Sequence, residues 1–404
     1  MKANPLEGLR VLELGQFIAG PYAGLQLADL GAQVIKIERP GTGDPFREFG
    51  IGTGRPGYSH NFCAFNRNKL SIALDINTPR GQEVFLRAVS QADVVVENFR
   101  AGVMTRLGLG YEALRERNAR LIFCSIAGFA EDGPHRDRPA YDAVGQSISG
   151  LLSLMVDPRD PRILGPTISD QVTGMQACLG ILAALHERAR TGVGARVEVT
   201  MVEATMALIP DAFTAYTQGN AVLGPESRSA ASMSFSFACK DGRLLAIHVS
   251  STEKFWRGLL AAVERPELAA DPRFVDRPRR VRNYAALADE LRPVFAARTS
   301  EQWMARLAEH DVPAATVNSI PEAMRDPEVL HLGMFSQLEH PQLGTVTAMR
   351  RAVRIDKARE ARPLPPPALG EHTEQVLGAL GYAQADIEAL LREGVAATAA
   401  QSPG

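Results

Sequence analysis

The chain has 404 residues, of which 45% are hydrophobic and 22% are charged, and this balance excludes a disordered, collagenous or coiled-coil protein. Its 44 Lys and Arg residues nearly balance 46 Asp and Glu residues, so the net charge of -2 gives no overall attraction to nucleic acid or acidic lipid. A chain of this length suits two or three domains of about 150 residues each.

The four cysteines, Cys63, Cys124, Cys178 and Cys239, are scattered and include no C-x-x-C pair. This spacing argues against a disulfide framework or a zinc site, and the apolar surroundings of Cys124 and Cys178 predict core positions. The first residues lack a secretory h-region, and no apolar run approaches the roughly 18 residues of a transmembrane span. We therefore expect a cytoplasmic protein with no metal site and no membrane partner.

Short apolar strands alternate with helical patterns through the first 200 residues. Helices are predicted over 23–30, from Pro79 to about Ser90, over 171–190 with Gly192 as a C-terminal stop, and from about Val202. Strands are predicted at 11–14, 34–37, 71–74, 94–96, 121–124 and 196–200. Because these strands are apolar on both faces, the pattern predicts an α/β fold with a parallel sheet that helices cover on both sides.

A smaller unit is predicted to begin after Gln218, where a loop-like stretch rich in Gly and Ser covers 219–234. It should contain a strand over 243–249 and helices over 253–263, 287–295 and 300–309. The basic segment 277–282 has no interleaved aromatic residues, so we interpret it as a solvated loop or a subunit contact rather than a nucleic-acid site. A proline-rich linker over 363–367 precedes a last pair of helices.

The usual nucleotide and hydrolase motifs are missing from this pattern. The turn after the first strand, Gly15-Gln-Phe-Ile-Ala-Gly20, has the wrong spacing for a dinucleotide fingerprint. No Walker lysine follows a glycine loop, and His186-Glu187 lacks the second histidine of a zinc protease. The segment 145–150 misses the spacing of a nucleophile elbow by one residue. The sequence therefore indicates an α/β enzyme without a common cofactor fingerprint.

A likeness to a known family is carried by short segments in a fixed order along nearly the whole chain. These segments lie at 8–13, 19–21, 30–39, 43–44, 66–69, 74–75, 97–102, 140–142, 169–170, 187–194 and 369–373. Together they resemble the family III CoA-transferases, a group that includes formyl-CoA transferase, L-carnitine CoA-transferase and the related α-methylacyl-CoA racemase. No single segment is decisive, but their order and spacing together are a strong signal.

The resemblance implies a domain arrangement and an assembly. It implies a large Rossmann-like CoA-binding domain over 1–218, a small α/β domain over 219–330, and a linker with a C-terminal return to the large domain over 331–404. Two ring-shaped chains of this kind would pass through each other as an interlocked homodimer. The substrates would be an acyl-CoA, which brings CoA as a thioester, and a carboxylic acid, with no tightly bound cofactor.

Asp170 matches the catalytic aspartate of the family. Considered without the family, Asp170 is a helix N-cap or a first-turn acid, which free N–H groups and the helix dipole would stabilise. The two interpretations are compatible, because a helix N-terminus would hold the carboxylate ionised, as a carboxylate nucleophile requires.

Further positions match residues that contact CoA in the family. Arg39 follows a strand at the end where α/β sheets bind ligands, and its guanidinium suits a phosphate. Considered without the family, Arg39 is interpreted as a surface arginine. Asn77 stands where formyl-CoA transferase has a lysine, so a phosphate contact from this side chain is weakened. The full set of CoA positions is Phe17, Ile18, Arg39, Leu74, Asp75, Ile76, Asn77, Asn98, Phe99, Arg100 and Arg106.

Tyr141 and Asp142 match the tyrosine and the acid that flank the thioester in the transferases. The racemase has a histidine near the Tyr141 position, and a tyrosine hydroxyl is a poor replacement for a proton-abstracting group near pH 7. Ile18 stands where formyl-CoA transferase has a substrate-contacting glutamine, and 229–232 is the nearest match to its tetraglycine loop. Exchange between formate and oxalate is therefore not expected.

The main hypothesis is a CoA-transferase that moves CoA from an acyl-CoA to a small organic acid, with a dicarboxylate as one option. The resemblance implies a route through an aspartyl mixed anhydride and an aspartyl-CoA thioester. Two alternatives stay open. One is an acyl-CoA racemase or epimerase with the same CoA pocket, and the other is a CoA-binding paralogue without catalysis.

Overall fold

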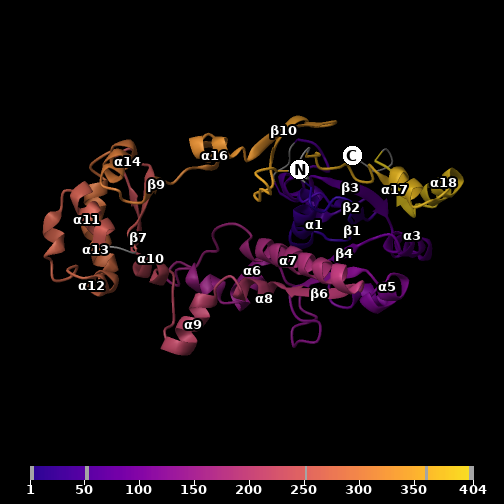
Figure 1. Cartoon of the computed structure of the whole chain (residues 1–404), viewed down its shortest axis with the longest axis horizontal. Helices are drawn as coiled ribbons and strands as arrows, with labels where there is room; N and C mark the ends of the chain where they lie inside the picture. Colours follow the sequence, from indigo (N-terminus) through magenta and orange to yellow (C-terminus); the bar gives the residue numbers. More distant parts are fainter. Residues whose placement is uncertain (1–3, 51–53, 251–252, 360–362, 400–404) are drawn as a thin grey trace. The chain divides into compact units, whose positions relative to one another are not determined.

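The computed structural model describes residues 4–50, 54–250, 253–359 and 363–399 (Figure 1). The chain divides into two compact units. The large unit comprises Met1–Leu151, Gly165–Ile209 and Leu332–Gly404, and the small unit comprises Leu152–Leu164 and Pro210–His331. We predicted boundaries after residues 218 and 330. In the structure the first boundary lies nine residues earlier, after residue 209, and the second lies one residue later, after residue 331.

A seven-stranded sheet forms the centre of the large unit, and all of its strands except β12 are parallel (Figure 1). The strands lie in the order β12-β3-β2-β1-β4-β5-β6. Their bounds are β1 Arg10–Glu13, β2 Gln33–Glu38, β3 Lys69–Leu74, β4 Val94–Glu97, β5 Ile122–Ala127, β6 Ala195–Thr200 and β12 Ala396–Ala397. All six strands predicted for this part of the chain are present, so the α/β fold with a mainly parallel sheet is confirmed.

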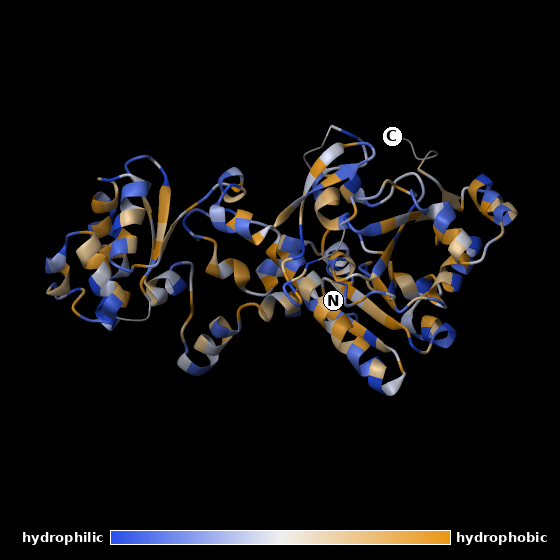
Figure 2. Ribbon diagram, turned by 45° about the horizontal axis from the view of Figure 1, so that its top comes forward, coloured by the Kyte–Doolittle hydropathy of each residue, from blue (hydrophilic) through white to orange (hydrophobic). Residues whose placement is uncertain are grey.

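Helices cover both faces of this sheet. Alternate residues of each strand serve the two faces, as the pleat requires, so that Val11 points to one core and Leu12 to the other. One face packs against α1 Ala19–Asp29 and α7 Ile168–Thr191. The other packs against α3 Pro79–Val89, α5 Tyr111–Arg117, α17 Thr373–Ala379 and α18 Gln384–Arg392. Figure 2 shows apolar residues concentrated on the strands and hydrophilic residues on the outer faces of the helices.

The 24-residue helix α7 carries the candidate nucleophile in its first turn. It ends at Gly192, whose φ of 77° is the left-handed conformation that glycine adopts without steric cost, and this confirms the predicted stop. A Cβ atom on Gly174 would lie 2.7 Å from the carbonyl oxygen of Ala19, so α1 and α7 can approach closely only because this residue is glycine. Among the described residues α7 is also the one helix with the length and hydropathy of a membrane span.

The remaining elements of the large unit connect the sheet and its covering helices. They are η1 Pro45–Arg47, α2 His60–Asn66, α4 Val103–Arg106, α6 Asp142–Ile148, α8 Met201–Met206, β10 Phe335–His340 and β11 Gly344–Met349. Helices α6 and α8 pack against each other and against α7, close to the start of that helix. The antiparallel hairpin of β10 and β11 was not predicted from the sequence.

The small unit is built on a three-stranded antiparallel sheet. Its buried core includes Trp256, Phe295 and Trp303, and the indole N–H of Trp303 donates to the carbonyl oxygen of Phe295 at 2.8 Å. Its strands are β7 Ser234–Ala238, β8 Leu244–His248 and β9 Ala314–Thr316. Its helices are α9 Pro210–Gly219, α10 Ser227–Ser232, α11 Glu253–Ala262, η3 Pro266–Ala269, α12 Arg277–Arg282, α13 Tyr284–Phe295, α14 Ser300–Glu309 and α15 Ile320–Ala323, and most of η2 Leu151–Leu154 and α16 Pro327–Leu332 also belongs to it.

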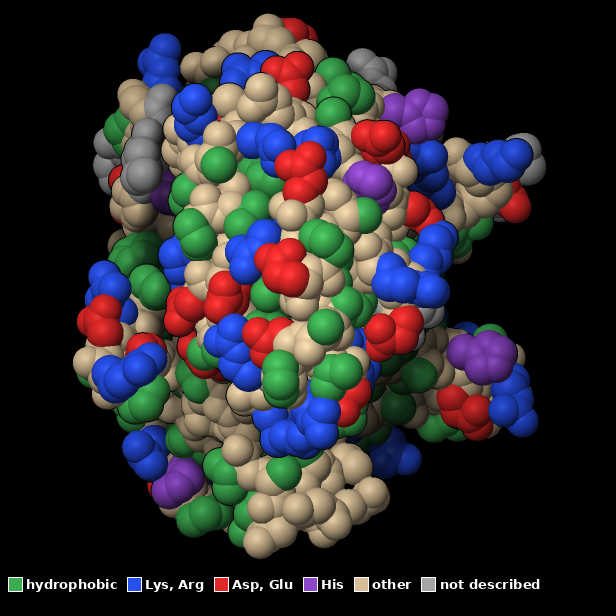
Figure 3. Space-filling view, turned by 90° about the vertical axis from the view of Figure 1, so that its left-hand side faces the viewer, with side chains coloured by type: hydrophobic (Ala, Val, Ile, Leu, Met, Phe, Trp, Pro, Cys, Tyr) green, Lys and Arg blue, Asp and Glu red, His purple; other side chains and the backbone are tan. Residues whose placement is uncertain are grey.

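The loop alternative for the basic segment 277–282 was wrong, since the segment forms helix α12, and the subunit-contact alternative stays a prediction. The carboxylate of Asp276 accepts the N–H of Arg279 and so caps the first turn. Arg280 is buried, with its guanidinium 4.7 Å from the centre of the Trp256 ring and paired with Glu253. Figure 3 shows positive and negative side chains interspersed on the side of the molecule that it views. The cap from Asp276 and the contacts of Arg280 give the segment 277–282 a structural role within the small unit.

Candidate active site

A cavity of about 270 Å³ opens at the carboxyl ends of β1, β4 and β5, beside the first turn of α7. This is the edge where parallel α/β sheets bind ligands. The cavity brings together residues that are far apart in the sequence. Seven residues of the predicted site line this cavity, namely Phe17, Ile18, Asn98, Phe99, Arg100, Tyr141 and Asp170.

Asp170 is the third residue of α7, and its backbone N–H donates to the carboxylate of Asp142 at 3.2 Å. The N-cap position belongs to Thr167, so the N-cap alternative for Asp170 was wrong and the first-turn alternative is confirmed. Helix α6 reaches the start of α7 because Gly145 has no side chain, since a Cβ atom there would lie 2.3 Å from Ser169 Oγ. That close approach is what places the Asp142 carboxylate beside Asp170.

The pKa of Asp170 is raised from its usual value of 3.8 to about 7, first by burial and then by the negative charge of Asp142. Burial removes water from the charged form, and a like charge nearby disfavours it further. We expected the helix N-terminus to hold this carboxylate ionised, and the structure corrects that expectation because burial and Asp142 outweigh the helix dipole. A carboxylate of this kind is partly protonated at neutral pH and is a stronger nucleophile than an ordinary aspartate when ionised.

The turn over 15–18 forms the wall of the cavity at the end of β1. Asn98, at the end of β4, holds this turn from one side, because its amide accepts the N–H of Gln16 and donates to the carbonyl oxygen of Gln16, both at 2.8 Å. Phe17 has a φ of 61°, a left-handed conformation that is unfavourable for a residue with a side chain. Its ring meets the Tyr141 ring edge-on, with centroids 5.7 Å apart.

Other predicted CoA positions lie on the same edge of the sheet but do not line this cavity. Arg39 and Arg106 are exposed, and Leu74 and Ile76 belong to the buried core. Asp75 and Asn77 form a tight turn in which the Asp75 carboxylate accepts the N–H of Asn77 at 3.0 Å. Their assignment to CoA stays a prediction.

A second cavity, of about 840 Å³, adjoins the first, and the residues that line both are Phe99, Arg100, Ala101, Ala127, Phe129 and Arg136. Glu97 lines it, and burial raises the pKa of this carboxyl group to about 7. The carboxylate accepts the Ser125 hydroxyl and the N–H of Phe99. Sequence reasoning missed Glu97 as an ionisable group of the site, although a charged residue directly after three valines is an available signal. In the described ranges no cluster of His, Cys, Asp or Glu could hold a metal ion.

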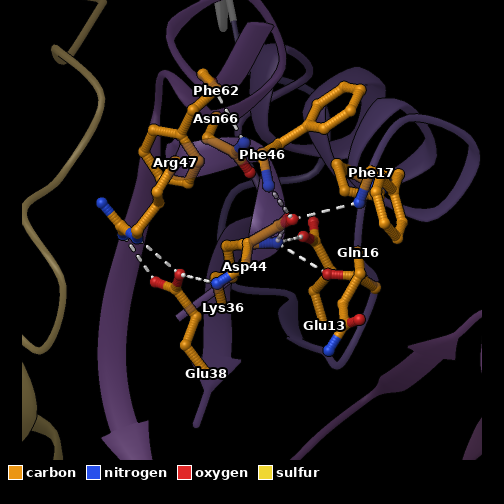
Figure 4. A network of polar contacts seen from close by, with 12 residues as sticks. Glu13, Gln16, Phe17, Lys36, Glu38, Asp44, Phe46, Arg47, Phe62 and Asn66 are labelled. Carbon is orange, nitrogen blue, oxygen red and sulfur yellow. Dashed lines mark hydrogen bonds and ion pairs between the residues drawn. The ribbon is translucent and has the colours of Figure 1, made fainter. Parts of the chain in front are cut away.

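Sequence reasoning also missed six buried ionisable side chains beside the 15–18 turn, most of which Figure 4 labels. We call them the buried ion cluster, and they are Glu13, Lys36, Glu38, Asp44, Arg47 and Lys69. Each residue is at most 4% exposed. The available signal was a Lys and a Glu inside the apolar strand β2, because charged residues are rarely buried without partners.

Comparison with known proteins gives the same likeness along the chain. The model of "CoA-transferase family III" matches residues 6–373. The chain is 34% identical to the succinyl-CoA:glutarate CoA-transferase of Mus musculus, with 97% of this chain and 90% of that protein covered. It is 33% identical to the succinyl-CoA–D-citramalate CoA-transferase of Chloroflexus aurantiacus, with 96% and 97% covered. The crystal structure of a CAIB/BAIF family protein from Brucella suis matches with a TM-score of 0.83 and 32% identity, over 94% of this chain and 100% of that chain.

These matches extend over both units of the chain and are not confined to one motif. The segments that carried the resemblance in the sequence lie within them, so the resemblance is confirmed. Both relatives are named as CoA-transferases, which favours transfer over racemisation. The chain therefore belongs to CoA-transferase family III and is a CoA-transferase.

Proposed function

We propose that this enzyme moves CoA from succinyl-CoA to a small dicarboxylic acid, with Asp170 as the nucleophile. The observation that carries the proposal is the Asp170 carboxylate, whose pKa is raised to about 7 and which lines the cavity of about 270 Å³ at the carboxyl edge of the sheet. The names of the two relatives support the substrate class, because glutarate and citramalate are both dicarboxylates and succinyl-CoA is the donor in each name.

The first half of the reaction transfers CoA from the donor to Asp170 and releases the donor acid. The Asp170 carboxylate attacks the thioester carbonyl carbon, the C–S bond breaks, and a mixed anhydride forms as the CoA thiolate leaves. The thiolate then attacks the aspartyl carbonyl carbon, which releases the donor acid as a carboxylate and leaves an aspartyl-CoA thioester. Holding CoA in place makes this return step effectively intramolecular.

The second half repeats these steps with the acceptor acid. Its carboxylate attacks the aspartyl thioester, which gives a second anhydride and a thiolate. The thiolate then attacks the acceptor carbonyl carbon, so the new acyl-CoA forms and the Asp170 carboxylate is restored. The covalent route divides one difficult exchange between weak nucleophiles into easier steps. In this proposal Phe17, Ile18, Tyr141 and Asp142 surround the reacting thioester.

A screen of acceptor acids tests the proposed function directly. Purified enzyme with succinyl-CoA should form a new acyl-CoA with glutarate or citramalate, and much less with acetate, as resolved by liquid chromatography. A branched 2-methylacyl-CoA incubated in deuterium oxide without any acid should gain no deuterium at the α-carbon. Deuterium exchange without transfer would replace the proposal with the racemase alternative. CoA binding with neither activity would favour the non-catalytic paralogue.

Two exposed arginines are proposed to bind the phosphates of CoA, each at the carboxyl edge of the sheet. We expect Arg39→Ala and Arg106→Ala each to weaken CoA binding by about 1.5–3 kcal/mol, the value of a hydrogen bond to a charged group. Isothermal titration calorimetry with free CoA measures the change. Arg292→Ala, which removes an exposed arginine of the small unit, is the control and should leave CoA affinity unchanged. Unaltered affinity in both test variants would place the phosphates elsewhere.

We also propose that the enzyme is an interlocked homodimer in the cytoplasm. Exposed apolar side chains on and after α7 and α8 support a protein contact there, since large apolar residues are seldom exposed together without a partner. They are Met175, Leu179, Met206 and Leu208, which are 38–61% exposed. Sedimentation should give twice the chain mass of 43.7 kDa and no dissociation on dilution, because linked rings cannot separate. An active monomer would contradict this assembly.

A further inference from the structure

The buried ion cluster is a connected set of ion pairs contributed by β1, β2, β3 and the segment around η1 (Figure 4). Lys36 Nζ lies 2.9 Å from Asp44 Oδ2 and 3.1 Å from Glu13 Oε1. Glu13 Oε2 in turn lies 2.7 Å from Lys69 Nζ. These four side chains therefore share one chain of contacts between opposite charges.

The second part of the cluster holds the backbone that carries Asp44. Arg47 donates to both carboxylate oxygens of Glu38 at 2.7 Å, a bidentate arrangement that fixes the orientation of both groups. The pKa of Glu38 is held down at about 2, since Arg47, Lys36 and Ser71 together outweigh the effect of burial. The same carboxylate accepts the N–H of Asp44 at 3.1 Å. Asp44 is thus held both at its backbone and at its side chain.

Two members of the cluster make hydrogen bonds to the turn that lines the Asp170 cavity. Lys36 Nζ donates to the carbonyl oxygen of Gly15 at 2.7 Å. Asp44 Oδ1 accepts the N–H of Phe17 at 3.1 Å and that of Phe46 at 2.9 Å. The first of these bonds fixes the start of the turn, and the second fixes the one residue of the turn whose φ is unfavourable.

The cost of burying these charges indicates that they serve more than the stability of the fold. A buried ion pair is weak evidence for stability, because well-packed apolar residues of similar volume often stabilise a fold as well. A charged group supplies something that an apolar residue cannot, namely a strong hydrogen bond to a backbone group. Lys36 and Asp44 direct such bonds at the wall of the cavity, although neither side chain lines the cavity itself.

We propose that Lys36 and Asp44 are positioning residues that hold the 15–18 turn in the conformation in which it contacts the thioester beside Asp170. This inference rests on the proposed function and deepens it. The two side chains touch no reacting atom in this account. They act through Gly15 and Phe17, while Asn98 holds Gln16 by two hydrogen bonds.

The variant Asp44→Asn tests this role with little change in volume. Lys36 would attract the amide oxygen, so the NH2 group would face the N–H groups of Phe17 and Phe46, where the carboxylate now accepts hydrogen bonds. We expect kcat to fall about 10- to 100-fold, the range that a misplacement of about 1 Å produces at an active site. KM for the acyl-CoA should change far less. Hydrogen–deuterium exchange of the unliganded enzyme should become faster in the peptide that covers 15–18.

The matched control is Asp29→Asn. Asp29 is also buried and paired with an arginine, Arg67, but it lies at the other end of α1 from the turn. This variant should lose stability while keeping kcat and the exchange rate of the turn. Equal losses of kcat in the two variants, or unchanged exchange over 15–18 in Asp44→Asn, would overturn the proposal.

A second variant and a measurement without substrate allow the proposal to be tested even if Asp44→Asn does not fold or the enzyme shows no transfer. If Asp44→Asn does not fold, Asp44→Glu retains the charge of the cluster, moves the carboxylate by one methylene group, and is judged by the same two measurements. The exchange measurement needs no substrate. If the wild-type enzyme transferred no CoA to any acid, the proposed function would fail, and the exchange rate over 15–18 would still decide whether Asp44 holds the turn.

Discussion

Asp170→Asn is expected to reduce CoA transfer at least about 10³-fold while leaving the enzyme folded, because an amide cannot form the acyl anhydride and the loss of a nucleophile removes the covalent route. Wild-type enzyme treated with acyl-CoA and then hydroxylamine should carry a modified peptide that contains Asp170. Label on another carboxylate, or turnover above a few per cent of wild type, would contradict the assignment.

The same variant should be more stable than the wild type at pH 8. The folded-state pKa of Asp170 is about 7 against a usual 3.8, so the folded protein favours the protonated form. The stability that this group contributes is therefore fully present below pH 3.8 and is lost as the pH rises to about 7. Asparagine stays neutral at every pH, so we expect it to raise the free energy of unfolding by about 1–4 kcal/mol at pH 8 and by less at pH 5. Denaturant unfolding at both values measures the difference.

Asp211→Asn is the matched control for this effect. Asp211 is also an acid in the first turn of a helix, α9, but it is exposed. Its replacement should remove a favourable interaction with the helix dipole and so lower stability by about 0.3–1 kcal/mol. The opposite signs expected for Asp170 and Asp211 would separate the effect of burial from that of helix position. A loss of stability in both variants would show that Asp170 is an ordinary first-turn acid.

These two aspartates also show why the sequence predicted the fold more fully than the site. The strands and long helices were predictable because their signals are local, as in the apolar run of β4 and the glycine stop after α7. Asp170 and Asp211 share a local pattern, and only the packing of distant segments buries one and exposes the other. The catalytic assignment of Asp170 therefore came from the family resemblance and not from the residues around it.

The buried ion cluster illustrates the same limit for non-local contacts. Lys36 lies in a strand that was predicted from its apolar neighbours, and nothing next to it in the sequence indicates its partner Glu13, which is 23 residues away. Helix α12 was not predicted, for a related reason. Its arginines suggested a solvated loop, whereas Arg280 is buried against Trp256, a contact that depends on the fold of the small unit.

Asp142→Asn is expected to move the acid limb of the pH profile to lower pH. The negative charge of Asp142 is, after burial, the second cause that raises the pKa of Asp170, and asparagine removes that charge while keeping an oxygen that can accept the Asp170 N–H. In the wild type kcat/KM for succinyl-CoA should fall below about pH 7, as the nucleophile becomes protonated. In the variant the pKa of Asp170 is lowered toward its usual value, so half-maximal activity should occur at a more acidic pH.

The height of the profile should change together with its midpoint. A carboxylate with a lower pKa is a weaker nucleophile, so the plateau of kcat/KM above pH 8 should be lower in Asp142→Asn than in the wild type. Tyr141→Phe is the matched control, because it removes a hydroxyl group from the neighbouring residue and changes no charge. It should leave the midpoint of the acid limb in place, whatever it does to the plateau. If the midpoint of the acid limb in Asp142→Asn is unchanged or lies at a higher pH than in the wild type, the charge of Asp142 does not govern the ionisation of the nucleophile.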